Sequence, residues 1–124
     1  MRGGKYVILC VDDDPDILEY LRVVLEANDY AVVGASSAEA GLRAYRETPP
    51  DLVIADLMME EIDSGTGFVK QLQAWGNRAP IYMLSSVGDN LNTNADYSAL
   101  GLTGVFQKPL DSEVLLSLLK AKLK

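Results

Sequence analysis

Five short apolar runs alternate with segments of helical periodicity along the 124 residues of this chain. The strand runs are apolar throughout rather than alternating, which is typical of parallel strands covered on both faces. We therefore expect an α/β fold, a five-stranded parallel sheet doubly wound with helices on both faces. The predicted strands are 5–11, 30–35, 51–56, 80–85 and 103–107, and the predicted helices are about 14–28, 37–47, 66–75, 90–100 and 111–123.

Helix-capping residues mark where several of these helices begin. Asp14 fits the N-cap of the first helix, with Pro15 at the first helical position. Ser36 and Glu39 have the spacing of a capping box for the second helix. Asp111 fits the N-cap of the last helix.

Composition excludes several classes of function. The net charge of −7 argues against DNA or RNA binding by this domain itself, because phosphate binding needs clustered Lys and Arg. The absence of histidine removes histidine-dependent nucleophilic catalysis, histidine-ligated zinc and a phosphohistidine carrier role. The single cysteine, Cys10, lies in an apolar run and is expected to be a small buried hydrophobe without a disulfide partner.

The length of the chain fits one domain, residues 1–124, and we expect no output domain within it. No apolar run approaches the length of a membrane span. The first five residues lead directly into a strand-like run and lack an apolar signal segment. These features predict a cytoplasmic protein that does not contact a membrane.

Acidic residues stand at the ends of two apolar runs. Asp12 and Asp13 follow the first predicted strand, and Asp56 ends the third. The carboxyl ends of parallel strands share one edge of the sheet, so these acids should lie together. Two unit charges about 4 Å apart repel by roughly 4 kcal/mol at an effective dielectric of 20. Such crowding indicates that a cation binds there or that chemistry takes place there.

Two further polar residues are predicted at the same edge, because Ser85 closes the fourth strand and Lys108 follows the fifth. This set suits phosphoryl transfer onto a carboxylate. Asp56 could be the nucleophile, since carboxylates form acyl phosphates. A hard divalent ion such as Mg²⁺ would neutralise the acids, while the hydroxyl and the lysine would hold phosphoryl oxygens.

Four segments of the chain, in this order and spacing, resemble the signature segments of response regulator receiver domains of two-component systems. They are 11–15 (Val-Asp-Asp-Asp-Pro), 51–58 (Asp-Leu-Val-Ile-Ala-Asp-Leu-Met), 83–86 (Met-Leu-Ser-Ser) and 106–110 (Phe-Gln-Lys-Pro-Leu). The resemblance spans the whole chain and implies a flavodoxin-like receiver fold with strand order 2-1-3-4-5.

The resemblance also implies roles for single residues. Asp56 would be the phosphoryl acceptor. Asp13, Asp56 and the backbone carbonyl of Met58 would ligate Mg²⁺, with Asp12 acting mainly through water. Ser85 would contact the phosphoryl group and carry the switch.

By the same resemblance, Lys108 would bridge to the phosphoryl oxygens. A sensor histidine kinase or a histidine phosphotransfer protein would donate the phosphoryl group. The response would appear on the face formed by residues 90–100, 103–107 and 111–123, which an unknown output partner or domain would contact. The sequence does not decide between a monomer and a homodimer.

The chain departs from the family pattern at several positions, three of which bear on the switch and on the lifetime of the phosphoryl group. The family has an aromatic residue three positions before the lysine, where this chain has Val105 and places Phe106 one position further on. Because neighbours in a strand face opposite sides, Phe106 is not expected to replace it. Met58 and Val87 occupy positions that tune the lifetime of the phosphoryl group in the family. Neither side chain can orient a water by hydrogen bonding, so we expect slow autodephosphorylation.

The sequence leaves two alternatives to a phosphorylated signalling module. A constitutive receiver-like interaction module is suggested by Val105 at the position of the family's aromatic residue. An enzyme with an aspartyl-phosphate intermediate is disfavoured, because such enzymes commonly need a second Asp two residues after the nucleophile, where this chain has Met58. We therefore expect a phospho-acceptor that catalyses only its own phosphorylation and slow dephosphorylation.

Overall fold

The computed structural model of the protein describes residues 4–56, 64–85, 104–107 and 111–123. Its elements are β1 (Val7–Val11), α1 (Pro15–Glu26), β2 (Ala31–Ala35), α2 (Ala38–Glu47), β3 (Leu52–Asp56), α3 (Ser64–Ala74), β4 (Ile81–Ser85), β5 (Gly104–Gln107) and α4 (Ser112–Lys122). The helix predicted at 90–100 lies outside the described residues, so α4 is the helix predicted at 111–123. The other predicted elements are all present, with ends that differ by one or two residues.

The five strands form one parallel sheet in the order β2-β1-β3-β4-β5, which confirms the predicted order. Strand β1 lies between β2 and β3 and pairs with both, so that Leu9 lies opposite Val33 of β2 and Val53 of β3. The chain steps outward from β1 to β2 and then returns to the other side of β1 as β3. This reversal places a switch point at the carboxyl ends of β1 and β3, where ligands bind in open α/β sheets.

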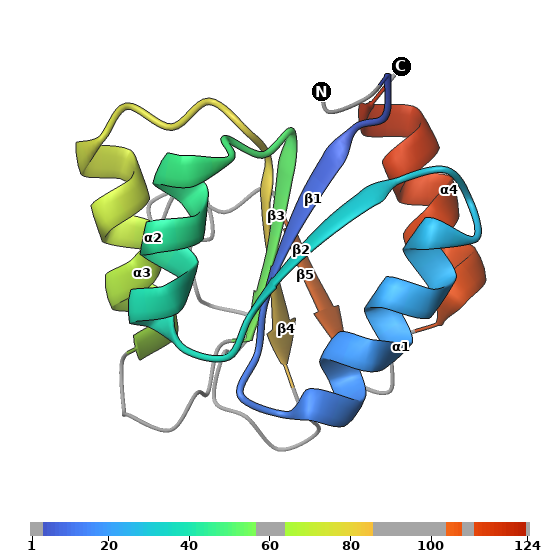
Figure 1. The fold of residues 1–124 in the computed structure, drawn as a ribbon, viewed down its shortest axis with the longest axis horizontal. Coiled ribbons are helices and arrows are strands. Elements are labelled where there is room, and N and C mark those ends of the chain that lie inside the picture. Colours follow the sequence, from blue (N-terminus) through green and yellow to red (C-terminus); the bar gives the residue numbers. More distant parts are fainter. Residues whose placement is uncertain (1–3, 57–63, 86–103, 108–110, 124) are drawn as a thin grey trace.

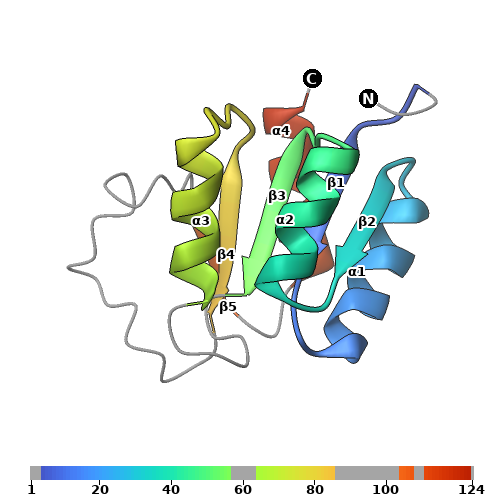
Figure 2. The same ribbon diagram turned by 60° about the vertical axis from the view of Figure 1, so that its left-hand side comes forward.

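Helices cover both faces of the sheet, with α1 and α4 on one side and α2 and α3 on the other (Figures 1 and 2). Alternate residues of β1 serve the two faces: Ile8 and Cys10 join the core beneath α1 and α4, whereas Leu9 and Val11 join the core beneath α2 and α3. Because both faces are buried, polar residues do not alternate with apolar ones in this strand, as the sequence predicted.

The structure confirms two of the predicted N-caps. The Asp14 carboxylate accepts a hydrogen bond from the Asp16 N–H at 2.9 Å, and Pro15 occupies the first position of α1. The Asp111 carboxylate accepts hydrogen bonds from the N–H groups of Glu113 and Val114. Each cap satisfies N–H groups that the first turn of a helix leaves without an intrahelical acceptor.

The capping box predicted for α2 is wrong by one residue. The N-cap is Ser37, whose Oγ accepts a hydrogen bond from the Ala40 N–H at 3.1 Å. Glu39 does not reach back to the cap, because its carboxylate lies 3.5 Å from the Arg43 guanidinium one turn further along α2. Two consecutive serines precede the helix, and spacing alone could not decide between them. The extended backbone of Ser37 (φ −153°, ψ 165°) is what brings its hydroxyl over the first turn.

None of the helices in the described part of the chain combines the length and the hydrophobicity needed to cross a lipid bilayer.

Candidate functional site

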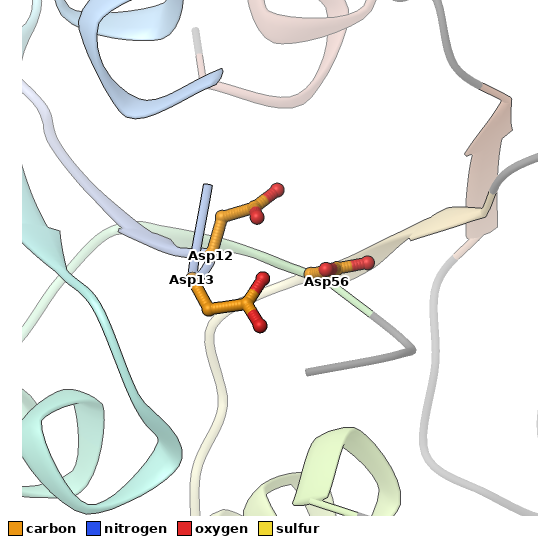
Figure 3. Close-up of side chains that lie close together, drawn as sticks. All are labelled: Asp12, Asp13 and Asp56. Carbon is orange, nitrogen blue, oxygen red and sulfur yellow. The ribbon is translucent and has the colours of Figure 1, made fainter. Parts of the chain in front are cut away.

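Three carboxylates meet at the switch point of the sheet (Figure 3). Asp12 and Asp13 follow β1 directly, and Asp56 is the last residue of β3. Val11 pairs with Ala55, so the next residues along the two strands are neighbours. One carboxylate oxygen from each of the three acids lies within 4.8 Å of the other two. The structure therefore confirms that the predicted acids lie together.

The three acids differ in their exposure to solvent. Asp12 is 0% exposed and Asp56 is 4% exposed, whereas Asp13 is exposed. Burial makes the charge of the two inner carboxylates more costly, because water no longer screens their mutual repulsion. The cluster thus has a buried part, Asp12 and Asp56, and an exposed part, Asp13. A ligand from solvent would reach the cluster at Asp13.

The backbone holds the Asp12 carboxylate in place. The Asp12 N–H donates to the carbonyl of Ala35 at 3.0 Å, which continues the β1–β2 ladder past the end of the strand. The Asp14 N–H donates to Asp12 Oδ1 at 2.9 Å. Asp14 therefore both caps α1 and fixes the buried acid. The sequence indicated only the cap, although an Asp side chain that accepts from the N–H two residues later is a common turn motif.

A second contact lies at the other end of β1, where this strand pairs with β3. It sets the register that brings the acids together. Asp51 Oδ2 accepts a hydrogen bond from the Val7 N–H at 2.7 Å, and the Asp51 N–H donates to the Val7 carbonyl at 2.7 Å. A shift of β1 against β3 by one residue would break both bonds and move Asp12 away from Asp56. This role of Asp51 could not be predicted from the sequence, because nothing local to the residue indicates it.

The other predicted site residues are only partly described. Ser85 is the last residue of β4, one position beyond Leu84, which pairs with Asp56. Its backbone thus reaches the edge of the sheet that carries the acids, but its side chain lies outside the described part of the structure. Lys108 and Met58 also lie outside the described residues.

Phe106, the aromatic residue one position after Val105, is buried. It is 7% exposed and belongs to the core beneath α1 and α4. Its ring lies 5.3 Å from that of Tyr82, centroid to centroid. Val105 pairs with Met83 in the sheet, and the side chain of Val105 is not described.

The donor set of the cluster fits a hard divalent cation. All three residues offer carboxylate oxygens, the ligands that Mg²⁺ and Ca²⁺ prefer. Oxygens bound to one Mg²⁺ lie at most about 4.2 Å apart, twice the usual Mg–O distance. Oxygens within 4.8 Å of one another therefore need to move little to share one ion. A cation there would offset the repulsion between the two buried charges.

Comparison with known proteins identifies the family. The family model described as the response regulator receiver domain matches residues 8–120. Among curated relatives, the transcriptional regulatory protein KdpE of Mycobacterium tuberculosis is 34% identical over 118 residues, which cover 95% of this chain and 51% of KdpE. The DNA-binding response regulator MtrA of Mycolicibacterium smegmatis is 35% identical, over 94% of this chain and 50% of MtrA. The chain thus spans about half the length of these relatives.

Solved structures agree with the sequence matches. The chemotaxis protein CheY4 of Vibrio cholerae superimposes with a TM-score of 0.83 at 28% identity, over 97% of this chain and all of CheY4. A putative response regulator from Chloroflexus aurantiacus gives a TM-score of 0.84 at 30% identity, over 97% of this chain and 98% of its own. With the fold, the acidic cluster and the family match in agreement, this chain belongs to the response regulator receiver domains of two-component systems.

Proposed function

We propose that this chain receives a phosphoryl group on Asp56 from a sensor histidine kinase or a histidine phosphotransfer protein. The reaction would take place in the cytoplasm and depend on Mg²⁺, held by Asp12, Asp13, Asp56 and the backbone carbonyl of Met58. One observation carries the proposal: a buried carboxylate at the switch point of the sheet has two further carboxylates within 4.8 Å.

The chemistry follows from the position of Asp56. A carboxylate oxygen of Asp56 would attack the phosphorus of a phosphohistidine; the P–N bond breaks and an acyl phosphate forms on Asp56. The cation, when bound, supplies positive charge that offsets the repulsion between the acids and the incoming phosphoryl oxygens. Asp12 and Asp13, which follow β1, would hold it together with Asp56.

Two further residues would complete the site on the side of β4 and β5. Ser85 would contact the phosphoryl group, and Lys108 would bridge to its oxygens. Charge neutralisation and positioning are most of what such a transfer requires. With the apolar Met58 and Val87 at the positions that tune the lifetime in the family, the acyl phosphate would decay slowly.

Phosphorylation would then alter the face formed by residues 90–100, β5 and α4, and a partner or output domain would read the change. The curated relatives are transcriptional regulators of about twice this length, which supports a downstream output in the control of transcription. Residues 1–124 would act as the receiver unit. The net charge of −7 argues that DNA binding, where it occurs, belongs to another domain.

The test is a titration of the ¹⁵N-labelled protein with MgCl₂ and then with beryllofluoride, a phosphoryl analogue, followed by NMR. In the wild type we expect Mg²⁺ to shift the amides after β1 and at the end of β3, and beryllofluoride to extend the changes to β5 and α4. The Asp56→Asn variant should lose the response to beryllofluoride, because it lacks the accepting carboxylate.

Asp29→Asn removes the same charge at an exposed turn far from the cluster and should respond as the wild type does. A beryllofluoride response that survives in Asp56→Asn would show that another residue is the acceptor. A wild-type protein that responds to neither reagent would favour the constitutive interaction module instead.

A further inference from the structure

A groove of about 640 Å³ runs between α2 and α3, away from the acidic cluster. Figures 1 and 2 show the two helices side by side on the same face of the sheet. Leu42, Arg46 and Glu47 line the groove from α2, and Trp75 lines it from the end of α3. Glu47 precedes β3, whose far end carries Asp56. The end of the groove at Glu47 and Trp75 therefore lies toward the amino ends of the strands. The acidic cluster lies at the opposite edge of the sheet.

Trp75 is exposed and yet held in place. It is 41% exposed, and it is the only tryptophan of the chain. Its ring lies 5.9 Å from that of Tyr45 on α2, centroid to centroid. The Tyr45 hydroxyl donates to Asn77 Oδ1 at 2.7 Å, which ties α2 to the turn that follows Trp75. An aromatic side chain fixed before a ligand arrives loses little conformational entropy on binding.

Arg46 completes this end of the groove. Its guanidinium carbon lies over the Trp75 ring, 5.5 Å from the centroid. Two other arginines form ion pairs along their own helices: Arg22 with Glu26 at 3.8 Å and Arg43 with Glu39 at 3.5 Å. Among the described residues, no carboxylate lies within ion-pair distance of Arg46. A guanidinium above an aromatic face keeps the N–H donors at its edge available, and these match a carboxylate.

We propose that this groove binds a segment of a partner protein that carries a single carboxylate beside apolar side chains. The carboxylate would pair with Arg46, and the apolar side chains would pack on Leu42 and Trp75. Charge complementarity supports this occupant, because Arg46 has no carboxylate partner among the described residues, whereas Arg43 of the same groove is paired with Glu39. Glu39 and Glu47 flank the groove, so a run of acids would be repelled while one carboxylate is accepted.

The surface lies outside the phosphoryl-transfer site, so the proposal does not depend on the proposed function. It can be tested with the unphosphorylated protein and a capped peptide of leucines and alanines around one central aspartate. Trp75 fluorescence reports directly on the groove, and NMR amide shifts locate the contact. We expect saturable changes at α2 and at the end of α3, and weaker binding at high salt.

Matched peptides and variants separate the contributions of charge and shape. Replacing the aspartate of the peptide by asparagine, or Arg46 by Gln, should each weaken binding by up to about fivefold, the upper end of the range for one exposed ion pair. Arg22→Gln removes an exposed arginine elsewhere and should leave the affinity unchanged. Glu47→Gln should tighten binding, and a peptide with three consecutive aspartates should bind less tightly than the peptide with one.

Several results would overturn the proposal. Absence of any change at α2 and Trp75 with millimolar peptide would do so, as would equal affinity for the aspartate and asparagine peptides. An equal effect of Arg22→Gln and Arg46→Gln would show only a general charge effect. Self-association of the protein that Arg46→Gln abolishes would identify a second copy of the chain as the occupant and would exclude a separate partner.

Discussion

Asp13 is the exposed member of the acidic cluster, and its charge opposes folding when no cation is bound. Asp12 and Asp56 are buried within 4.8 Å of it. We expect Asp13→Asn to raise the free energy of unfolding in EDTA by about 1 kcal/mol, since one repelling charge is removed at a partly screened site. Magnesium should stabilise the wild type and stabilise this variant much less, because the variant binds the ion weakly.

Thermal unfolding over a series of Mg²⁺ concentrations checks this, and the two curves of Tm against Mg²⁺ should cross. Asp29→Asn is the matched control, because Asp29 has a left-handed backbone (φ 69°) that Asn also adopts readily. It changes the net charge equally and should leave both the Tm and its dependence on Mg²⁺ near wild type. An Asp13→Asn protein that is less stable than the wild type in EDTA would contradict the charge-crowding argument.

At the scale of the element, Gly41 lets α2 pack closely on β1. A Cβ at this position would lie 2.8 Å from Val11 Cγ2 and 2.9 Å from a ring carbon of Phe68. Gly41→Ala gains about 1 kcal/mol of helix propensity, but overpacking costs about 1–3 kcal/mol, so the balance favours destabilisation. Because Val11 precedes Asp12, its displacement should also weaken Mg²⁺ binding. Urea unfolding and Mg²⁺ titration measure the two effects.

Gly34 of β2 offers the control for this prediction. The nearest atom to a Cβ there is the end of the Arg22 side chain at 3.6 Å, an ordinary contact that a flexible side chain relieves. Gly34→Ala should change the free energy of unfolding by less than about 0.5 kcal/mol. If Gly41→Ala proved equally harmless, the helix would not be positioned by this contact.

The elements show which parts of the fold the sequence could predict. Hydrophobic runs and cap residues such as Asp14 are local signals. They predicted the order along the chain and the approximate bounds of the described helices and strands, whereas the order of the strands within the sheet followed from the family resemblance. The choice of Ser37 over Ser36 as cap depends on backbone angles that no local pattern specifies. The Asp51 carboxylate that anchors Val7 joins residues 44 positions apart, so it emerges only when the strands pair.

At the scale of the whole molecule, the acidic cluster could be predicted from the sequence and the groove between α2 and α3 could not. The cluster of Asp12, Asp13 and Asp56 was predictable, because strand ends of a parallel sheet share an edge and the acids mark two of those ends. The groove at Arg46 and Trp75 was not, because its residues come from two helices whose separation depends on how both pack on the sheet. The spacing of residues in the sequence predicts which of them share a face of one helix or strand. A surface formed by two elements can be described only once the fold shows how those elements pack.

Cys10, buried in β1, links the ionisation of one thiol to the folding of the whole domain. Burial raises its pKa from about 9.0 to about 12, with a smaller opposing effect of Arg22. The unfolded thiol ionises first, so its contribution to stability is complete below pH 9 and is lost as the pH rises toward 12. The limiting slope for one proton is about 1.4 kcal/mol per pH unit.

Urea unfolding between pH 7 and 10 should therefore show stability falling above pH 9 in the wild type. Burial also raises the pKa of Tyr30, Tyr45 and Tyr82, but these phenols ordinarily ionise near pH 10. Cys10→Ala should lower stability at pH 7 through the cavity it leaves, and should lose less than the wild type between pH 9 and 10. Parallel curves for the two proteins would mean that the thiol does not ionise on unfolding. In that case the alkaline loss of stability would have to come from other groups, such as the buried tyrosines.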